Sequence, residues 1–193
     1  MKKLKVIAIG VAALLLTSCN PTGKPRGEFR LLPQPKSVQF MGNSKIRPGD
    51  IQHYRLADGI KMPLPDAYVK DLEETFSLSV PQVVFRREID LALDDEEYVL
   101  EIGRKQVSIS GEKRAGLLYG WMTLQQLMAD AKEQGVPLPM CRIQDSPELD
   151  YRAIHIDIKH HRERKDYYYA LMDQLALYKI NAIILEVEDK LAY

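Results

Sequence analysis

An acidic cluster follows a short apolar run near the end of this 193-residue sequence. Residues 182–185 are apolar and rich in β-branched side chains, and Glu186, Glu188 and Asp189 lie in the stretch that follows. A run of this kind predicts a fully buried strand. Because side chains alternate along a strand, Glu186 and Glu188 are expected on one face. The three carboxylates are candidate substrate-site residues; the alternative is a structural ion-pair network or a solvated strand end.

A second group of polar residues follows an earlier predicted strand, residues 153–158. Alternation places His155, Asp157 and Lys159 on one face of this segment, and His160 comes next in the chain. If that face lines a site, Lys159 can pair with a glutamate of the other strand. Asp157, Lys159 and His160 therefore join the candidates, and burial of Asp157 in a structural network is an equal alternative.

The sequence predicts no metal site and no cofactor. His160 and His161 are adjacent, so on a strand they point to opposite faces and do not share a metal easily. The consecutive tyrosines at 167–169 splay around a helix, which favours packing over sugar stacking. Cys141 lies in an apolar setting and is expected to be a buried thiol without a disulfide partner.

These polar groups belong to a predicted βαβ unit. The strands at 153–158 and 182–187 flank a helical segment on which Tyr168, Leu171, Leu175 and Tyr178 mark one apolar face. The unit implies a parallel pair with a right-handed crossover. Two parallel strands with one helix cannot bury both faces of a sheet. Residues 147–193 are therefore expected to be the truncated start of a larger parallel domain.

Residues 29–146 are predicted to form one α+β domain, a hairpin-containing sheet with helices. Alternation at 98–102 and 107–109 around a Gly103 turn predicts a β-hairpin. An apolar stripe then predicts a helix that Gly135 caps, with Trp121 as its largest packing residue. An earlier helix is expected because Val69, Leu72 and Phe76 fall at helical spacing.

The first residues predict export. Lysines at positions 2, 3 and 5 precede an apolar run, and "LLTSC" closes the segment before Cys19. This pattern resembles the bacterial lipobox, so residues 1–18 are expected to be a lipoprotein signal peptide and Cys19 the site of lipid attachment. Residues 19–28 are rich in Pro, Gly and polar residues and indicate a flexible tether. The alternative is an ordinary cleaved signal peptide.

The charge balance argues against nucleic acid as a partner. The chain holds 27 basic and 27 acidic residues, and without residues 1–18 the balance is 24 to 27, or −3. The sequence shows no basic stripe. A lipid anchor would instead place the protein in the bacterial cell envelope, at the periplasmic side or with the outer membrane.

Three stretches resemble family 20 glycoside hydrolases, the β-N-acetylhexosaminidases. They are "LLPQPKSVQF", "VSISGEKRAGLLYGWMTLQQL" and "LDYRAIHIDIK" with "ALYKINAIILEVED". In that family a small α+β domain precedes a (β/α)₈ barrel, so the resemblance implies that residues 147–193 begin the barrel. The last residues of the sequence, "LEVEDKLAY", resemble most the hexosaminidase D-like branch of the family. A sugar-binding arginine of the family falls on His160, and Asp189 matches the acid that ends the second barrel strand.

The resemblance implies the chemistry. Family 20 enzymes remove terminal N-acetylhexosamine from glycans, and the sugar's own acetamido oxygen attacks the anomeric carbon. Their catalytic Asp-Glu pair ends the fourth barrel strand, so no catalytic residue is assigned in this sequence and the fragment is expected to be inactive. Two alternatives stay open. One is a non-catalytic envelope lipoprotein that binds glycan or a partner, and the other is a pseudogene product without stable structure beyond about residue 145.

Overall fold

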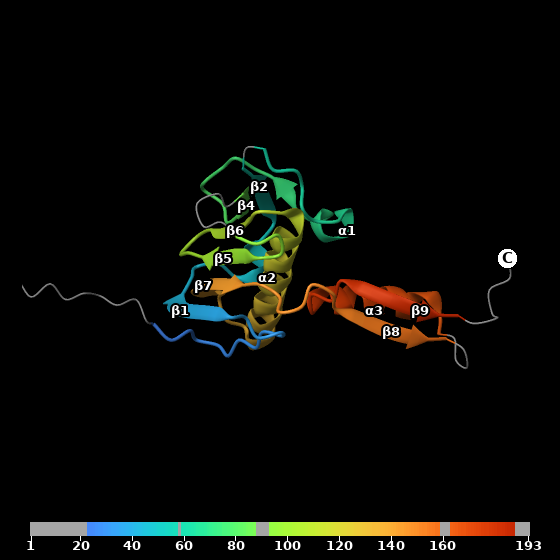
Figure 1. The fold of residues 1–193 in the computed structure, drawn as a ribbon. Coiled ribbons are helices and arrows are strands. Elements are labelled where there is room, and N and C mark those ends of the chain that lie inside the picture. Colours follow the sequence, from blue (N-terminus) through green and yellow to red (C-terminus); the bar gives the residue numbers. More distant parts are fainter. Residues whose placement is uncertain (1–22, 58, 88–92, 159–162, 188–193) are drawn as a thin grey trace, which may run out of the picture.

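The computed structural model describes residues 23–57, 59–87, 93–158 and 163–187 (Figure 1). Its larger part is a seven-stranded mixed sheet in the order β1-β7-β5-β6-β4-β2-β3. The strands are β1 (Ser37–Asn43), β2 (His53–Leu56), β3 (Glu73–Glu74), β4 (Val83–Arg87), β5 (Tyr98–Ile102), β6 (Val107–Gly111) and β7 (Pro139–Asp145). The helices of this part are η1 (Pro48–Asp50), α1 (Asp66–Val69) and α2 (Arg114–Gln134). Together they form the α+β domain.

The predicted hairpin is confirmed. Strands β5 and β6 pair antiparallel from Tyr98 opposite Gly111 to Ile102 opposite Val107. Gly103 N–H donates to the Gln106 carbonyl at 2.9 Å and closes the turn between them. On either side of this hairpin the pairing differs: β7 adds antiparallel to β5, whereas β4 adds parallel to β6. The domain is therefore an α+β fold with a mixed sheet, as the sequence predicted.

The long predicted helix is also confirmed and packs on the sheet (Figure 1). Trp121 is fully buried at the centre of the apolar stripe, with its ring 6.2 Å from the Phe85 ring of β4. Gly116 lets the helix approach the sheet closely, because a Cβ at this position would collide with the Glu97 carbonyl. The helix ends where expected: Gly135 adopts a left-handed φ of 66° and its N–H bonds to the carbonyls of the last turn.

The helix predicted around Phe76 was wrong. Helix α1 ends at Val69, and Phe76 is 77% exposed. The reason is a non-local pairing that helical spacing does not reveal. Glu73 N–H donates to Gln52 O at 2.9 Å, and Thr75 N–H donates to Tyr54 O at 2.8 Å. These bonds make β3 the edge strand beside β2, which begins at His53.

The segment before β1 lies along α2. Its backbone amides at every second residue donate to side-chain oxygens at every fourth residue of the helix, at 2.7–2.8 Å: Glu28 to Gln134, Arg30 to Asp130 and Leu32 to Gln126. Four residues of helix rise about 6.0 Å and two residues of an extended chain span about 6.6 Å. The two periods match, so the helix holds this segment as a neighbouring strand would.

The second part is the βαβ unit, with β8 (Ala153–Asp157), α3 (Lys165–Leu177) and β9 (Ala182–Glu186). The two strands pair parallel, from Ala153 opposite Ala182 to Asp157 opposite Glu186. Figure 1 shows the unit beside α2, on the side away from the seven-stranded sheet. The predicted strand at 182–187 exists, but it is not fully buried: Ile184 and Leu185 are 46% and 48% exposed. Within the described residues β9 has only β8 as a neighbour.

No helix in the described part of the chain is long and apolar enough to cross a membrane.

Candidate functional site

The carboxyl ends of β8 and β9 meet at one edge of the βαβ unit. Asp157 and Glu186 are partners in the strand register, and Ile158 N–H donates to the Glu186 carbonyl at 3.0 Å. Parallel pairing explains this, because it places the ends of both strands at the same edge. Two of the six candidates are thus brought together. The other four, Lys159, His160, Glu188 and Asp189, lie outside the described residues.

The described ion pair at this edge joins His155 and Glu186. The imidazole Nε2 lies 2.9 Å from the carboxylate Oε2, and the two side chains are 53% and 42% exposed. His155 is opposite Ile184 in the register, so Glu186 is its diagonal neighbour on the same face. The sequence placed His155 on one face with Asp157 and Lys159, and it predicted Lys159, which lies outside the described residues, as the partner of a glutamate. The register of β8 and β9 places His155 diagonally opposite Glu186, but sequence alone does not give that register.

The chemistry of this edge suits a polar ligand. An exposed imidazole and two carboxylates offer hydrogen-bond donors and acceptors to hydroxyl and amide groups. Among the described residues, no three His, Cys, Asp or Glu side chains are grouped so that they could hold a metal ion. The edge is therefore equipped to bind and orient a hydroxyl-rich molecule.

A buried lysine fixes the βαβ unit to the α+β domain. Lys179 follows α3, is 5% exposed, and donates from Nζ to Asp145 Oδ2 at 2.8 Å and to the Tyr98 hydroxyl at 3.0 Å. It is the one buried residue among the described residues after Asp145. Burial lowers the pKa of Lys179 and the Asp145 carboxylate opposes that shift. Burial and the same carboxylate raise the pKa of Tyr98 well above its usual value.

A second contact fixes the start of β8. Arg152 donates to Glu96 Oε2 at 2.9 Å, to the Tyr119 hydroxyl at 2.8 Å and to the Lys179 carbonyl at 2.8 Å. Burial alone would raise the pKa of Glu96, but the hydrogen bond and charge of Arg152 bring it below its usual value. Arg152 precedes β8 and Lys179 precedes β9, so the two contacts set where both strands begin and therefore where the edge lies.

A family model described as glycosyl hydrolase family 20, domain 2 matches residues 28–146. The chain belongs to glycoside hydrolase family 20.

Relatives in this family share sequence with the chain over different lengths. A β-N-acetylhexosaminidase of Cellulomonas fimi is 32% identical over 110 residues, which is 56% of this chain and 22% of that protein. β-Hexosaminidase B of Pseudoalteromonas piscicida is 24% identical over 168 residues, 82% of this chain and 20% of its own length. The chain thus spans about a fifth of these relatives.

Solved structures of family 20 enzymes have a similar fold. The β-N-acetylhexosaminidase of Streptomyces coelicolor A3(2) aligns with a TM-score of 0.65 and 26% identity over 82% of this chain and 35% of that one. The Streptomyces plicatus N-acetyl-β-hexosaminidase, in complex with Thio-NAglucal, gives 0.66 and 26% over 88% and 37%.

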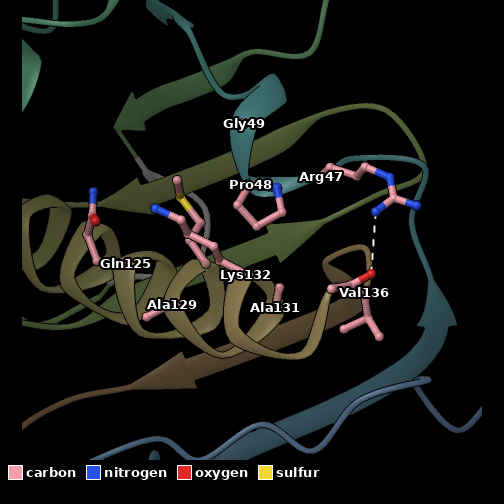
Figure 2. Close-up of a pocket in the computed structure, with 10 residues that line it drawn as sticks. Arg47, Pro48, Gly49, Gln125, Ala129, Ala131, Lys132 and Val136 are labelled. Atoms are coloured by element: carbon pink, nitrogen blue, oxygen red, sulfur yellow. Dashed lines mark hydrogen bonds between the residues drawn. The ribbon is translucent and has the colours of Figure 1, made fainter.

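The family 20 domain also carries a hollow far from the strand ends. It measures about 490 Å³ and lies between η1 and the second half of α2. Figure 2 shows Arg47 and Lys132 among its lining residues, and Arg47 Nη1 donates to the Gly135 carbonyl at 3.4 Å. Its walls are otherwise largely apolar, and no carboxylate lines it. No feature of the sequence pointed to this hollow.

Proposed function

We propose that this chain is the N-terminal part of a β-N-acetylhexosaminidase, a glycosidase that removes terminal N-acetylhexosamine from glycans by substrate-assisted hydrolysis. The observation that carries the proposal is the family 20 match over residues 28–146, together with similar proteins and structures that are named hexosaminidases. In such hydrolysis the substrate's acetamido oxygen attacks the anomeric carbon, so the protein supplies orientation and a proton and no covalent nucleophile.

The βαβ unit is proposed to be the first β/α/β segment of a (β/α)₈ barrel. Three observations support this assignment. The strands are parallel, α3 connects them, and both strands keep half-exposed apolar side chains such as Ile154 and Ile184. A barrel would bury these side chains, since its strands have neighbours on both sides and helices outside. The alignment with family 20 structures also reaches 88% of the chain, which is more than the α+β domain alone.

The substrate edge is proposed to be the carboxyl ends of β8 and β9. In barrels of this class the functional residues lie at that end of the strands. Asp157 and Glu186, with His155 beside them, would bind sugar hydroxyl groups and orient the ring. Four further candidates, Lys159, His160, Glu188 and Asp189, follow the two strands in the sequence. The general acid and the acetamide-orienting aspartate would come from a later strand, so residues 1–193 alone are proposed to be inactive.

The proposed location is the bacterial cell envelope, with the protein held by acyl chains on Cys19. The lipobox-like "LLTSC" supports this location. A glycosidase with this anchor would meet glycans on the far side of the inner membrane.

The test compares two purified proteins on two substrates. One protein is residues 19–193, and the other adds the coding sequence that continues in frame after residue 193. The substrates are 4-nitrophenyl N-acetyl-β-D-glucosaminide and 4-nitrophenyl β-D-glucoside, which lacks the acetamide. The longer protein is expected to hydrolyse the first and to leave the second almost untouched, because only the first carries the attacking oxygen.

Three results would contradict the proposal. Equal hydrolysis of both substrates would exclude assistance by the acetamide. If the genomic sequence after residue 193 encodes no barrel strands, the hydrolase proposal fails, and a non-catalytic module that binds glycan is favoured. Activity of residues 19–193 alone would contradict the assignment of the acid to a later strand.

A further inference from the structure

Exposed basic residues gather at one end of the α+β domain, although they are scattered along the sequence. They come from the segment before β1, the end of β1 and its continuation, the β5–β6 turn and the last turn of α2. The residues are Lys24, Arg26, Lys45, Arg47, Arg104, Lys105 and Lys132, and all seven are exposed. We call this set the basic end.

Backbone and side-chain contacts of residues 43–47 bring these four segments together. Arg26 N–H donates to Asn43 Oδ1 at 2.9 Å, and Lys45 N–H donates to the Arg104 carbonyl at 2.8 Å. Arg47 reaches the Gly135 carbonyl at the end of α2, and Lys132 lines the same hollow as Arg47 (Figure 2). One short stretch of chain therefore contacts every segment that contributes a cation, so the seven charges share one surface.

This surface is positive in a chain that is otherwise acidic. Residues 23–28, 42–50, 103–106 and 132–136 contain seven basic and three acidic residues. The rest of the chain after residue 18 then holds 17 basic and 24 acidic residues. Among the described residues, none of the seven cations forms an ion pair with a carboxylate. Unpaired cations with so few acids nearby create a local positive potential despite the mature net charge of −3.

The chain reaches this end from Cys19. Gly23 packs against the end of β1 so closely that a Cβ on it would lie 3.0 Å from Gly42 Cα. Cys19 lies four positions before Gly23, and a fully extended chain spans at most about 14 Å over four positions. An acyl chain on Cys19, as proposed above, would therefore hold the basic end near the membrane surface.

We propose that the basic end docks on an anionic phospholipid bilayer, as the second membrane signal beside the anchor at Cys19. Acyl chains on Cys19 would anchor the protein, and a cluster of cations adds attraction to acidic headgroups. The hollow between Arg47 and Lys132, apolar with two cations at its margin, suits the boundary between headgroup and acyl chain. Figure 1 shows β1 and the β5–β6 hairpin on the opposite side of α2 from β8 and β9. Docking through the basic end thus directs the proposed substrate edge away from the bilayer.

The test uses residues 19–193 with Cys19→Ser, so that no lipid is attached, and vesicle flotation as the readout. Vesicles of phosphatidylglycerol and phosphatidylcholine are compared with vesicles of phosphatidylcholine alone. Binding is expected to the anionic vesicles at about 0.02 M salt and to disappear at about 1 M, where the Debye length falls to about 3 Å. The triple variant Lys45→Glu, Arg104→Glu, Lys132→Glu should bind about 100-fold more weakly, since each cation contributes about fivefold.

The matched control makes the same change in net charge at other positions on the domain. Lys61, Lys70 and Lys113 are exposed, and Lys113 lies at the other end of α2 from Lys132. Their triple change to Glu should alter binding less than about threefold, because these lysines would not reach the headgroup layer. Circular dichroism of both triple variants checks that each is folded.

Three outcomes would overturn the proposal. Equal loss in the two triple variants would mean that net charge and not the basic end decides binding. Equal binding to neutral vesicles would exclude anionic headgroups. Tighter binding to a DNA duplex than to anionic vesicles at the same salt would assign the surface to nucleic acid. None of these results depends on hydrolysis, so this proposal and the glycosidase proposal can fail separately.

Discussion

The α+β domain and the βαβ unit bury their side chains in different ways. The domain has a dry core between its sheet and α2, in which Phe85, Leu100 and Trp121 are fully buried. The βαβ unit has no fully buried residue in α3, and its two strands are half exposed. Among the described residues of the unit, the one that is buried is Lys179, and its side chain is buried against the α+β domain and not in the unit itself.

The difference indicates what each part needs in order to be stable. Burial of apolar surface stabilises the domain by itself. The unit gains little from its own core and is held to the domain by the polar contacts of Lys179 and Arg152 and by apolar packing of the end of α3 against the domain core. Lys179 also adopts a left-handed φ of 62°, a conformation that costs a non-glycine residue about 1 kcal/mol or more. The ion pair with Asp145 must offset that cost, so its loss is expected to weaken the attachment of the βαβ unit to the domain.

The largest effect is expected from Lys179→Met. The change leaves the Asp145 carboxylate buried without its cation, and breaking a buried pair from one side costs about 3–5 kcal/mol. Hydrogen exchange read by mass spectrometry should lose protection in peptides from α3 and β9, while peptides from β5 and β6 stay protected. Arg142→Met, which breaks the more exposed pair with Glu101, is the control and should change neither region. Equal loss in both regions would mean that the chain unfolds as one unit.

A pair of leucine variants compares the two regions directly. Leu100 in β5 is fully buried and Leu185 in β9 is 48% exposed. Leu100→Ala should lower the free energy of unfolding by about 2–5 kcal/mol, and Leu185→Ala should change it by less than about 0.5 kcal/mol. Urea titration followed by fluorescence of Trp121, the one tryptophan of the sequence, gives the domain value. If both substitutions lower the free energy of unfolding equally, the half-exposed position of Leu185 in β9 is contradicted.

The parts of the fold that sequence predicted are those with a local pattern. The hairpin of β5 and β6, helix α2 and the order of β8, α3 and β9 each follow from periodicity within a short window. Strand β3 was missed because it exists through pairing with β2 and not through its own pattern. The glycine that caps α2 was predicted, but a lysine does not indicate a left-handed conformation, so the one that Lys179 adopts after α3 could not be predicted.

The site was predicted less completely, because its contacts join residues far apart. Lys179 and Asp145 are 34 positions apart, and Arg152 and Glu96 are 56 apart. Neither pair has a spacing that sequence could recognise. The sequence could place Asp157 and Glu186 near each other because parallel strands align their ends. The basic end shows the same limit, since a balanced composition without a basic stripe concealed a cluster that only the fold assembles.

The thiol of Cys141 tests how dry the domain core is. Burial raises the pKa of this thiol from 9.0 to about 12. The raised value means that the thiol stabilises the folded state fully below pH 9 and loses that contribution as the pH rises toward 12. Over that window the free energy of unfolding should fall by about 1.4 kcal/mol per pH unit more steeply than in Cys141→Ala. Urea titrations followed by circular dichroism between these pH values measure both slopes, and parallel profiles would mean that water reaches the thiol.

A small effect on stability is expected from His155→Ala. The pair with Glu186 is about half exposed on both sides, and such pairs contribute less than about 1 kcal/mol. In residues 19–193 the variant should therefore unfold within that margin of the unchanged chain, measured by urea titration. In the longer protein proposed above, the same variant should lower kcat/KM for the N-acetylglucosaminide about tenfold, the loss of one hydrogen bond to a charged group. Substitution of a structural residue lowers the stability of the protein, whereas substitution of a substrate-binding residue lowers turnover and leaves stability unchanged. If His155→Ala lowers stability by as much as Lys179→Met, the edge of β8 and β9 is a structural contact and the substrate edge must lie elsewhere.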